Sequence, residues 1–244
     1  MKKHIPNAIT CCNLISGCVA VVLAVYGLYS AALWAIIAGA VFDFFDGMSA
    51  RLLGVSSPIG KELDSLADVV TFGVAPSAML FHVLLGLNRM YELKVEEGLM
   101  GDILLFVFSY LPFLAFIMAA FSALRLAKFN LDERQTMGFI GMPTPANALF
   151  WGSLIVGWGP KIPFVPAIMP ILLVLMLLSC YLLVSEIPMF ALKFKTWGWK
   201  GNEVKWLFLG SCLPLLIFFG IGALAIIIAW YLILSVITQK QEAK

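Results

Sequence analysis

Long apolar runs separated by short polar stretches make up almost the whole chain. A transmembrane α-helix needs about 20 apolar residues, because the hydrocarbon core of a bilayer is about 30 Å thick. The runs predict eight membrane spans, at residues 8–28, 31–53, 60–86, 103–126, 144–159, 165–190, 205–219 and 222–238. The last two meet at Gly220-Ile221-Gly222, so residues 205–238 form either two short spans or one long tilted helix. The predicted fold is therefore all-α, a polytopic transmembrane helix bundle.

The composition agrees with a membrane protein and excludes other classes. Hydrophobic residues make up 62% of the chain and charged residues only 12%, whereas soluble domains carry about 25% charged residues. A net charge of +2 is too small to indicate a nucleic-acid partner. We divide the chain into a six-helix membrane core at residues 1–190 and a C-terminal part at 191–244. The latter comprises a cytoplasmic loop and two additional transmembrane helices.

The distribution of basic residues predicts the topology, since cytoplasmic loops collect Lys and Arg. With a cytoplasmic N-terminus and eight spans, all but three of the 16 Lys and Arg residues lie inside, the exceptions being Arg89, Lys94 and Lys161. Seven spans would place Lys240 and Lys244 outside as well. We therefore expect a multi-pass protein of the cell membrane with both termini in the cytoplasm.

Four aspartates interrupt the cytoplasmic halves of the second and third spans. Asp43 and Asp46 are three residues apart and Asp64 and Asp68 are four apart, so each pair shares a helix face. A carboxylate at the centre of a membrane helix costs about 2.5–3.5 kcal/mol. The short loop 54–59 lets all four converge. Oxygen ligands without neighbouring Cys or His suit Mg²⁺, Mn²⁺ or Ca²⁺, and four carboxylates can hold two ions.

Small residues and an arginine accompany the acids. Gly47 and Ala50 share the face of the first aspartates, and Gly60 lies one turn before the second pair, leaving room for a bulky ligand. Arg51 supplies a fork of donors for phosphate oxygens. Close packing between membrane helices is the alternative explanation for the glycines and the alanine.

The pattern D-x-x-D-G-x-x-A-R followed by G-x-x-x-D-x-x-x-D, at residues 43–68, resembles the signature of the CDP-alcohol phosphatidyltransferase family. All eight fixed positions match. The resemblance implies that the four aspartates coordinate two divalent ions, Mg²⁺ or Mn²⁺. It implies that Asp68 is the general base that deprotonates the acceptor alcohol, and that the enzyme is a homodimer. The implied pocket for the CDP head group comprises Asp46, Gly47, Ala50, Arg51, Gly60 and, in the loop, Ser57.

Polar residues near the start of the first span form a further candidate contact. Asn7, Thr10 and Asn13 are spaced by three and therefore share one face. They are candidates for hydrogen bonds to the cytidine or ribose of the CDP-lipid. Helix capping and hydrogen bonds between helices are the alternative.

Four stretches, at residues 6–14, 64–76, 125–130 and 141–147, add to the signature. They resemble the membrane-embedded phosphatidylserine synthase branch of the family. The resemblance implies that the hydroxyl of L-serine attacks the β-phosphorus of CDP-diacylglycerol in the membrane, giving phosphatidylserine and CMP. Lys128 and Asn147 depart from the pattern of the branch, where Arg and Ala are commoner.

Arg125 and Lys128 are the candidate residues for binding the serine carboxylate. Their alternative role is to anchor the cytoplasmic end of the fourth span. Glycerol phosphate and inositol phosphate remain possible acceptors, although a phosphate-bearing acceptor calls for more cations than these two. A cation transporter is the alternative from another class. Transporters more often show inverted repeats or broken helices, and an ion path has little use for Arg51.

Overall fold

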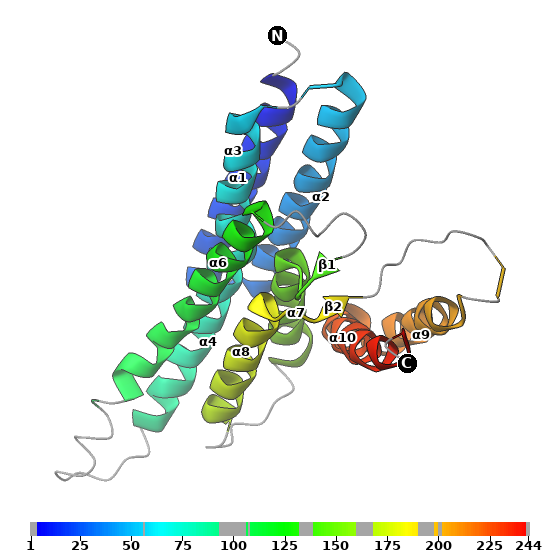
Figure 1. The fold of residues 1–244 in the computed structure, drawn as a ribbon. Coiled ribbons are helices and arrows are strands. Elements are labelled where there is room, and N and C mark those ends of the chain that lie inside the picture. The colour runs from blue at the N-terminus through cyan, green and yellow to red at the C-terminus, as the bar shows by residue number, and fades with distance from the viewer. Residues whose placement is uncertain are drawn as a thin grey trace.

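The computed structural model describes residues 4–55, 57–92, 106, 108–131, 139–159, 168–189, 198–199 and 202–242. These residues form a helical fold with one short strand pair (Figure 1). The α-helices are α1 (His4–Val25), α2 (Tyr29–Leu53), α3 (Pro58–Asp68), α4 (Ala75–Glu92), α6 (Ile117–Leu131), α7 (Thr144–Trp158), α8 (Ile168–Val184), α9 (Glu203–Phe219) and α10 (Ala223–Glu242). Shorter elements are the π-helix η1 (Val69–Val74) and the 3₁₀ turns η2 (Leu111–Phe116) and η4 (Gly220–Gly222).

Five helical stretches among the described residues are long and apolar enough to cross a membrane. They are His4–Val25, Tyr29–Leu53, Pro58–Met90, Phe108–Leu131 and Glu203–Thr238, and α8 is a shorter apolar helix. The prediction of an all-α, membrane-embedded fold is thus confirmed. The number of spans and the side on which the termini lie stay predictions. Arg134, Lys193 and Lys195, on which the topology partly rests, lie outside the described residues, as does the boundary at 190/191.

Helices α1, α2 and α3 form the end of the molecule that carries the N-terminus (Figure 1). A turn at Gly27, with φ of +73°, reverses the chain between α1 and α2. The chain then runs through α3, η1 and α4 as one nearly continuous helical stretch that packs against α1. This path brings the start of α1, the end of α2 and the start of α3 together.

The buried core is formed by the second half of α1, the first half of α2, and α4, α6, α7 and α8. Trp151 of α7 is fully buried, and its Nε1 donates a hydrogen bond to Ser179 Oγ of α8 at 3.1 Å. Phe72 and Met79, from the η1–α4 stretch, are also fully buried in this core. The helices that carry the aspartates are therefore anchored at one end on a packed apolar body.

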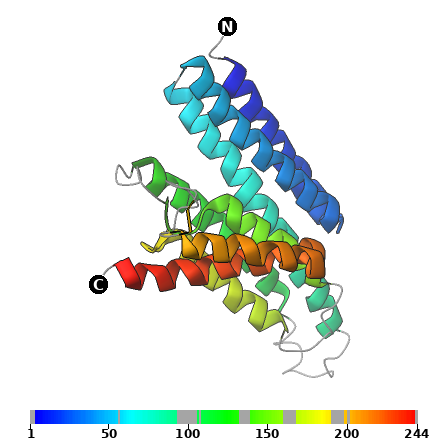
Figure 2. The ribbon, with the colours of Figure 1, turned by 90° about the vertical axis from the view of Figure 1, so that its right-hand side faces the viewer.

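The C-terminal helices α9 and α10 lie side by side as a hairpin (Figure 2). The chain reverses at Gly220, whose φ of +56° is accessible mainly to glycine. The hairpin docks on α7, where Trp158 Nε1 donates to the carbonyl oxygen of Gly222 at 3.1 Å. Of the two alternatives for residues 205–238, the structure therefore contains two helices, not one long one.

The two-residue strands β1 (Phe139–Ile140) and β2 (Pro188–Met189) pair antiparallel, a feature that the apolar runs did not predict. Next to this pair, the Met142 amide donates to the Leu182 carbonyl oxygen at 2.9 Å. The start of α7 is therefore fastened to the end of α8.

Candidate active site

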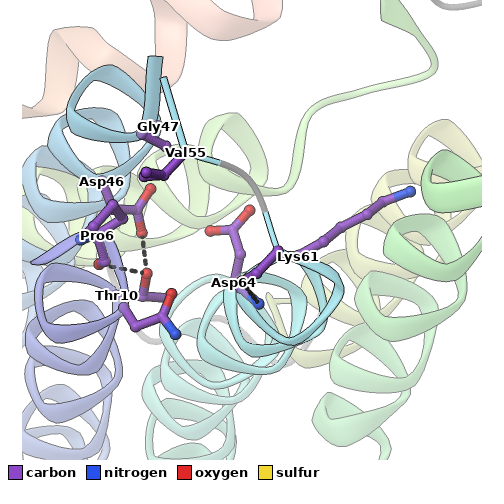
Figure 3. Close-up of a pocket in the computed structure, with 11 residues that line it drawn as sticks. Pro6, Thr10, Asp46, Gly47, Val55, Lys61 and Asp64 are labelled. Atoms are coloured by element: carbon purple, nitrogen blue, oxygen red, sulfur yellow. Dashed lines mark hydrogen bonds between the residues drawn. The ribbon is translucent and has the colours of Figure 1, made fainter. Parts of the chain in front are cut away.

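A cavity of about 270 Å³ lies between the start of α1, the end of α2 and the start of α3 (Figure 3). It brings together seven of the residues that the sequence predicted for the CDP-lipid site. These are Asn7, Thr10, Asp46, Gly47, Ala50, Ser57 and Gly60. The remaining lining residues are Pro6, Val55, Lys61 and Asp64.

The connection between α2 and α3 gives the cavity its shape. Gly54 ends α2 in the left-handed region, with φ of +61°. Ser57 is the N-cap of α3, since its Oγ accepts a hydrogen bond from the Gly60 amide at 3.0 Å. A Cβ on Gly60 would lie 3.1 Å from Asn7 Oδ1, so α1 and α3 approach closely here. A Cβ on Gly47 would meet no atom within 4 Å, because that position faces open space.

Three of the four aspartates converge beside this cavity. Asp43, Asp64 and Asp68 each offer a carboxylate oxygen, and these oxygens all lie within 4.8 Å of one another. Asp64 Oδ1 is buried and has no hydrogen-bond partner among the described residues. Like charges at this spacing repel strongly in a medium of low dielectric constant. The cluster therefore fits a hard divalent cation, which would neutralise the three groups and occupy the free lone pairs of Asp64.

Asp46 takes a different position from the other three acids. Its Oδ2 lies 2.7 Å from the Thr10 hydroxyl, which is also 3.0 Å from the Pro6 carbonyl oxygen (Figure 3). Asp64 stands across the cavity from this pair. The structure thus joins three aspartates in one group and assigns Asp46 to the wall formed with α1.

Asp68, the last residue of α3, is 8% exposed. The Asn13 side-chain amide donates to Asp68 Oδ1 at 3.0 Å. Asn13 does not line the cavity, although the sequence grouped it with Asn7 and Thr10 as a candidate cytidine contact. In the sequence, the one indication of this difference is that Asn13 follows Thr10 by about one helical turn, farther from the start of α1.

The predicted basic residues differ in their surroundings. Arg125 of α6 is 7% exposed, and its guanidinium carbon lies 5.1 Å from the centre of the Phe129 ring. Its charge interacts with that of Asp68. Arg51 and Lys128 are exposed, and Arg51 does not line the cavity. The cavity instead includes Lys61, which sequence reasoning used only for topology.

Lys61 and Asn130 link the rim of the cavity to α6. The Lys61 ammonium donates to the Asn130 carbonyl oxygen at 2.9 Å, and its side chain points away from the cavity (Figure 3). The Asn130 amide donates to Ser65 Oγ at 2.7 Å. Together these bonds hold the end of α6, the helix that carries Arg125, against α3.

The fold and the site define a membrane-embedded helical protein with a buried carboxylate cluster next to a polar cavity. The family model for CDP-alcohol phosphatidyltransferase matches residues 3–239, so the chain belongs to the CDP-alcohol phosphatidyltransferase family. The resemblance read from residues 43–68 is thereby confirmed. Members of this family generally depend on divalent metal ions, in agreement with the aspartate cluster.

Several relatives are similar over about 59–72% of the chain, and each bears the name CDP-diacylglycerol–serine O-phosphatidyltransferase. The Bacillus subtilis protein is 38% identical over 147 residues, which cover 59% of this chain and 70% of that one. The Methanocaldococcus jannaschii protein is 33% identical over 177 residues, covering 72% and 71%. The Helicobacter pylori J99 protein is 32% identical over 146 residues, and the match covers 54% of its length.

Proposed function

We propose that this protein is a phosphatidylserine synthase, which makes phosphatidylserine and CMP from CDP-diacylglycerol and L-serine. Family membership and the names of the relatives support this activity. The observation that carries it is the group of three carboxylates beside a cavity lined by the signature residues. We place the protein in the cell membrane with this site facing the cytoplasm, where positive residues cluster. A homodimer, as the family resemblance implies, is part of the proposal.

The proposed metal is Mg²⁺ or Mn²⁺, with two ions held by Asp43, Asp46, Asp64 and Asp68. Three of these acids already share one group, and Asp46 borders the same cavity. When bound, the ions would neutralise the diphosphate of the substrate and the charge that develops at phosphorus. Asp64 contributes a buried oxygen with no hydrogen-bond partner in the part of the chain that the structure describes, the expected condition of a ligand atom.

The CDP head group is proposed to occupy the cavity of about 270 Å³, with its acyl chains in the membrane. Gly47 offers bare helix backbone to the ligand, since a Cβ there would meet no described atom within 4 Å outside the adjoining helix backbone. Asn7 and Thr10 provide hydrogen-bonding groups from α1. Arg51, exposed just outside the cavity, is free to fold toward the phosphates.

Asp68 is proposed as the general base. Its carboxylate would accept the proton of the serine hydroxyl as that oxygen forms a bond to the β-phosphorus. The bond from the β-phosphorus to the bridging oxygen breaks, and CMP leaves with that oxygen. Because no covalent enzyme intermediate is involved, the protein contributes mainly position and electrostatic stabilisation.

The acceptor is proposed to bind between Asp68 and α6. Arg125 is a buried cation whose charge interacts with that of Asp68, which suits a guanidinium that pairs with the serine carboxylate. Lys128 is exposed one turn further along α6 and would attract the anion without desolvation. Among the residues that the structure describes, Arg125 is the one buried cation, which matches an amino-acid acceptor better than glycerol phosphate or inositol phosphate. A cation transporter is not favoured, because the chain belongs to a family of transferases.

The test is CMP release by the purified protein with CDP-diacylglycerol and Mn²⁺, comparing serine, glycerol 3-phosphate, inositol and inositol phosphate. Release with serine alone is the expected result. Release with a different alcohol would keep the metal site and contradict the acceptor assignment to Arg125. Folded protein that binds Mn²⁺ but releases no CMP with any acceptor would refute the proposed activity.

A further inference from the structure

Asn13 of α1 contacts the proposed general base, Asp68, at the end of α3. It is fully buried, and its side-chain amide donates to Asp68 Oδ1 at 3.0 Å. An ionised carboxylate can only accept hydrogen bonds, so the N–H side of the amide must face it. Among the described residues, this is the one hydrogen bond that the Asp68 carboxylate accepts from another helix.

Thr71, three residues after Asp68, holds Asn13 from the other side. Its hydroxyl donates to the backbone carbonyl oxygen of Asn13 at 3.0 Å, and Thr71 is fully buried. The residue lies in η1, the wide turn that directly follows Asp68. Such π-turns within helices are often found at functional sites. Asn13 of α1 is thus bonded twice to this stretch, by its side chain to Asp68 and by its backbone carbonyl to Thr71.

Two glycines make this pair of bonds possible. A Cβ on Gly17 of α1 would collide with the Thr71 hydroxyl, and a Cβ on Gly39 of α2 would lie 2.5 Å from Thr71 Cγ2. The Gly39 position would also be 2.9 Å from Asn13 Oδ1. Both helices therefore omit a side chain where η1 inserts Thr71 between them. The close packing at Gly17 and Gly39 leaves Thr71 and Asn13 little room to rotate.

Stability alone does not account for an asparagine at this position. Its Oδ1 is buried and has no hydrogen-bond partner among the described residues, which costs about 1–3 kcal/mol. A leucine would avoid that cost, but it would leave Asp68 Oδ1 without the hydrogen bond from Asn13. Asn13 also does not line the cavity, so it is not placed to contact the nucleotide.

We propose that Asn13 is a positioning residue that fixes the Asp68 carboxylate, with Thr71 holding Asn13 in turn. The amide occupies Oδ1, so Oδ2 would be the oxygen left for the metal and for the serine hydroxyl. This inference rests on the proposed role of Asp68. Partners that orient metal-binding carboxylates typically change metal affinity or activity by about 10–100-fold when they are removed.

The experiment measures Mn²⁺ affinity without substrate by electron paramagnetic resonance, and kcat and KM with CDP-diacylglycerol and serine. In protein that stays folded, Asn13→Leu is expected to weaken Mn²⁺ binding or lower kcat by roughly 10–100-fold, with an unchanged KM for CDP-diacylglycerol. Thr71→Val should lower the same quantity, Mn²⁺ affinity or kcat, by a smaller factor. Thr71→Ser keeps the hydroxyl and should leave that quantity at the value of the parent protein. Ser77→Ala is the matched control, since the buried Ser77 hydroxyl donates to the Gly73 carbonyl oxygen of its own helical stretch, its one hydrogen bond among the described residues.

Two results would overturn the inference. One is Asn13→Leu with both Mn²⁺ affinity and kcat within twofold of the parent protein. The other is losses across the Asn13 and Thr71 variants that follow a falling Tm or appear only in the KM for CDP-diacylglycerol. Parent protein that binds Mn²⁺ but releases no CMP would refute the proposed function instead, and the Mn²⁺ titration would still decide the role of Asn13.

Discussion

Replacement of Gly47 by alanine separates the demands of the ligand from those of the fold. Gly47 lies inside α2, and a Cβ at this position would meet no atom within 4 Å. Alanine favours a helix over glycine by about 1 kcal/mol. Gly47→Ala should therefore fold normally and have an unchanged or slightly higher Tm.

The same methyl group would intrude on the proposed nucleotide site. Gly47 lines the cavity of about 270 Å³ together with Asp46 and Thr10, and a ligand packed on the helix backbone would have to move. Overpacking of a well-fitted site costs about 1–3 kcal/mol, which corresponds to roughly a 5- to 150-fold weaker Kd. The KM for CDP-diacylglycerol should rise by this factor, and the KM for serine should stay the same.

The control is Gly86→Ala in α4, an exposed helical glycine whose Cβ would also meet no atom within 4 Å. It should bring the same gain in helix propensity and leave both KM values unchanged. If Gly47→Ala bound CDP-diacylglycerol as tightly as the parent protein, the nucleotide would not approach α2 at this point. A lower Tm would instead identify Gly47 as a packing residue.

Three further predictions test the acceptor site, the metal and the C-terminal hairpin. Arg125→Ala should raise the KM for serine by roughly 10–100-fold, as for a lost charged hydrogen bond of about 1.5–3 kcal/mol, whereas exposed Lys128→Ala should change it little; equal effects would contradict a carboxylate site at Arg125. Removal of divalent ions with EDTA should abolish CMP release, and Mn²⁺ or Mg²⁺ should restore it; activity that persists in EDTA would exclude the metal role. Gly157→Ala should lower the Tm, since a Cβ there would collide with the Gly222 backbone, at a cost of about 1–3 kcal/mol; a Tm equal to that of the parent would show that the hairpin docks elsewhere.

Helical spacing predicted much of the site because the acids lie on two adjacent antiparallel helices. The short turn after Gly54 fixes how α2 meets α3, so the face that carries Asp43 had to meet the face that carries Asp64 and Asp68. Asp46 shows the limit of this reasoning. A spacing of three residues is 300° of helical rotation, so Asp46 is turned about 60° away from Asp43. That turn directs it toward Thr10, and spacing alone could not tell which neighbouring helix each acid would face.

The wide turn η1 had no local signal in the sequence. Its residues, Val69–Val74, contain no proline and continue an apolar run that reads as regular helix. The features that mark the wide turn are its contacts with other helices. Thr71 donates to the Asn13 carbonyl oxygen of α1, and a Cβ on Gly73 would lie 3.0 Å from Ser122 Cβ of α6. The strand pair at 139–140 and 188–189 likewise joins segments too far apart in the chain for periodicity to connect.

The position of Asp46 gives the site two unlike sides. On one side, Asp46 and Thr10 border the cavity that we assign to the CDP head group. On the other, Asp68 is buried near Arg125, the residue that we assign to serine. An in-line displacement at phosphorus requires the attacking and leaving oxygens to lie on opposite sides of the phosphorus. A nucleotide that leaves into the cavity beside Asp46 and a hydroxyl that arrives from the side of Arg125 would meet that requirement.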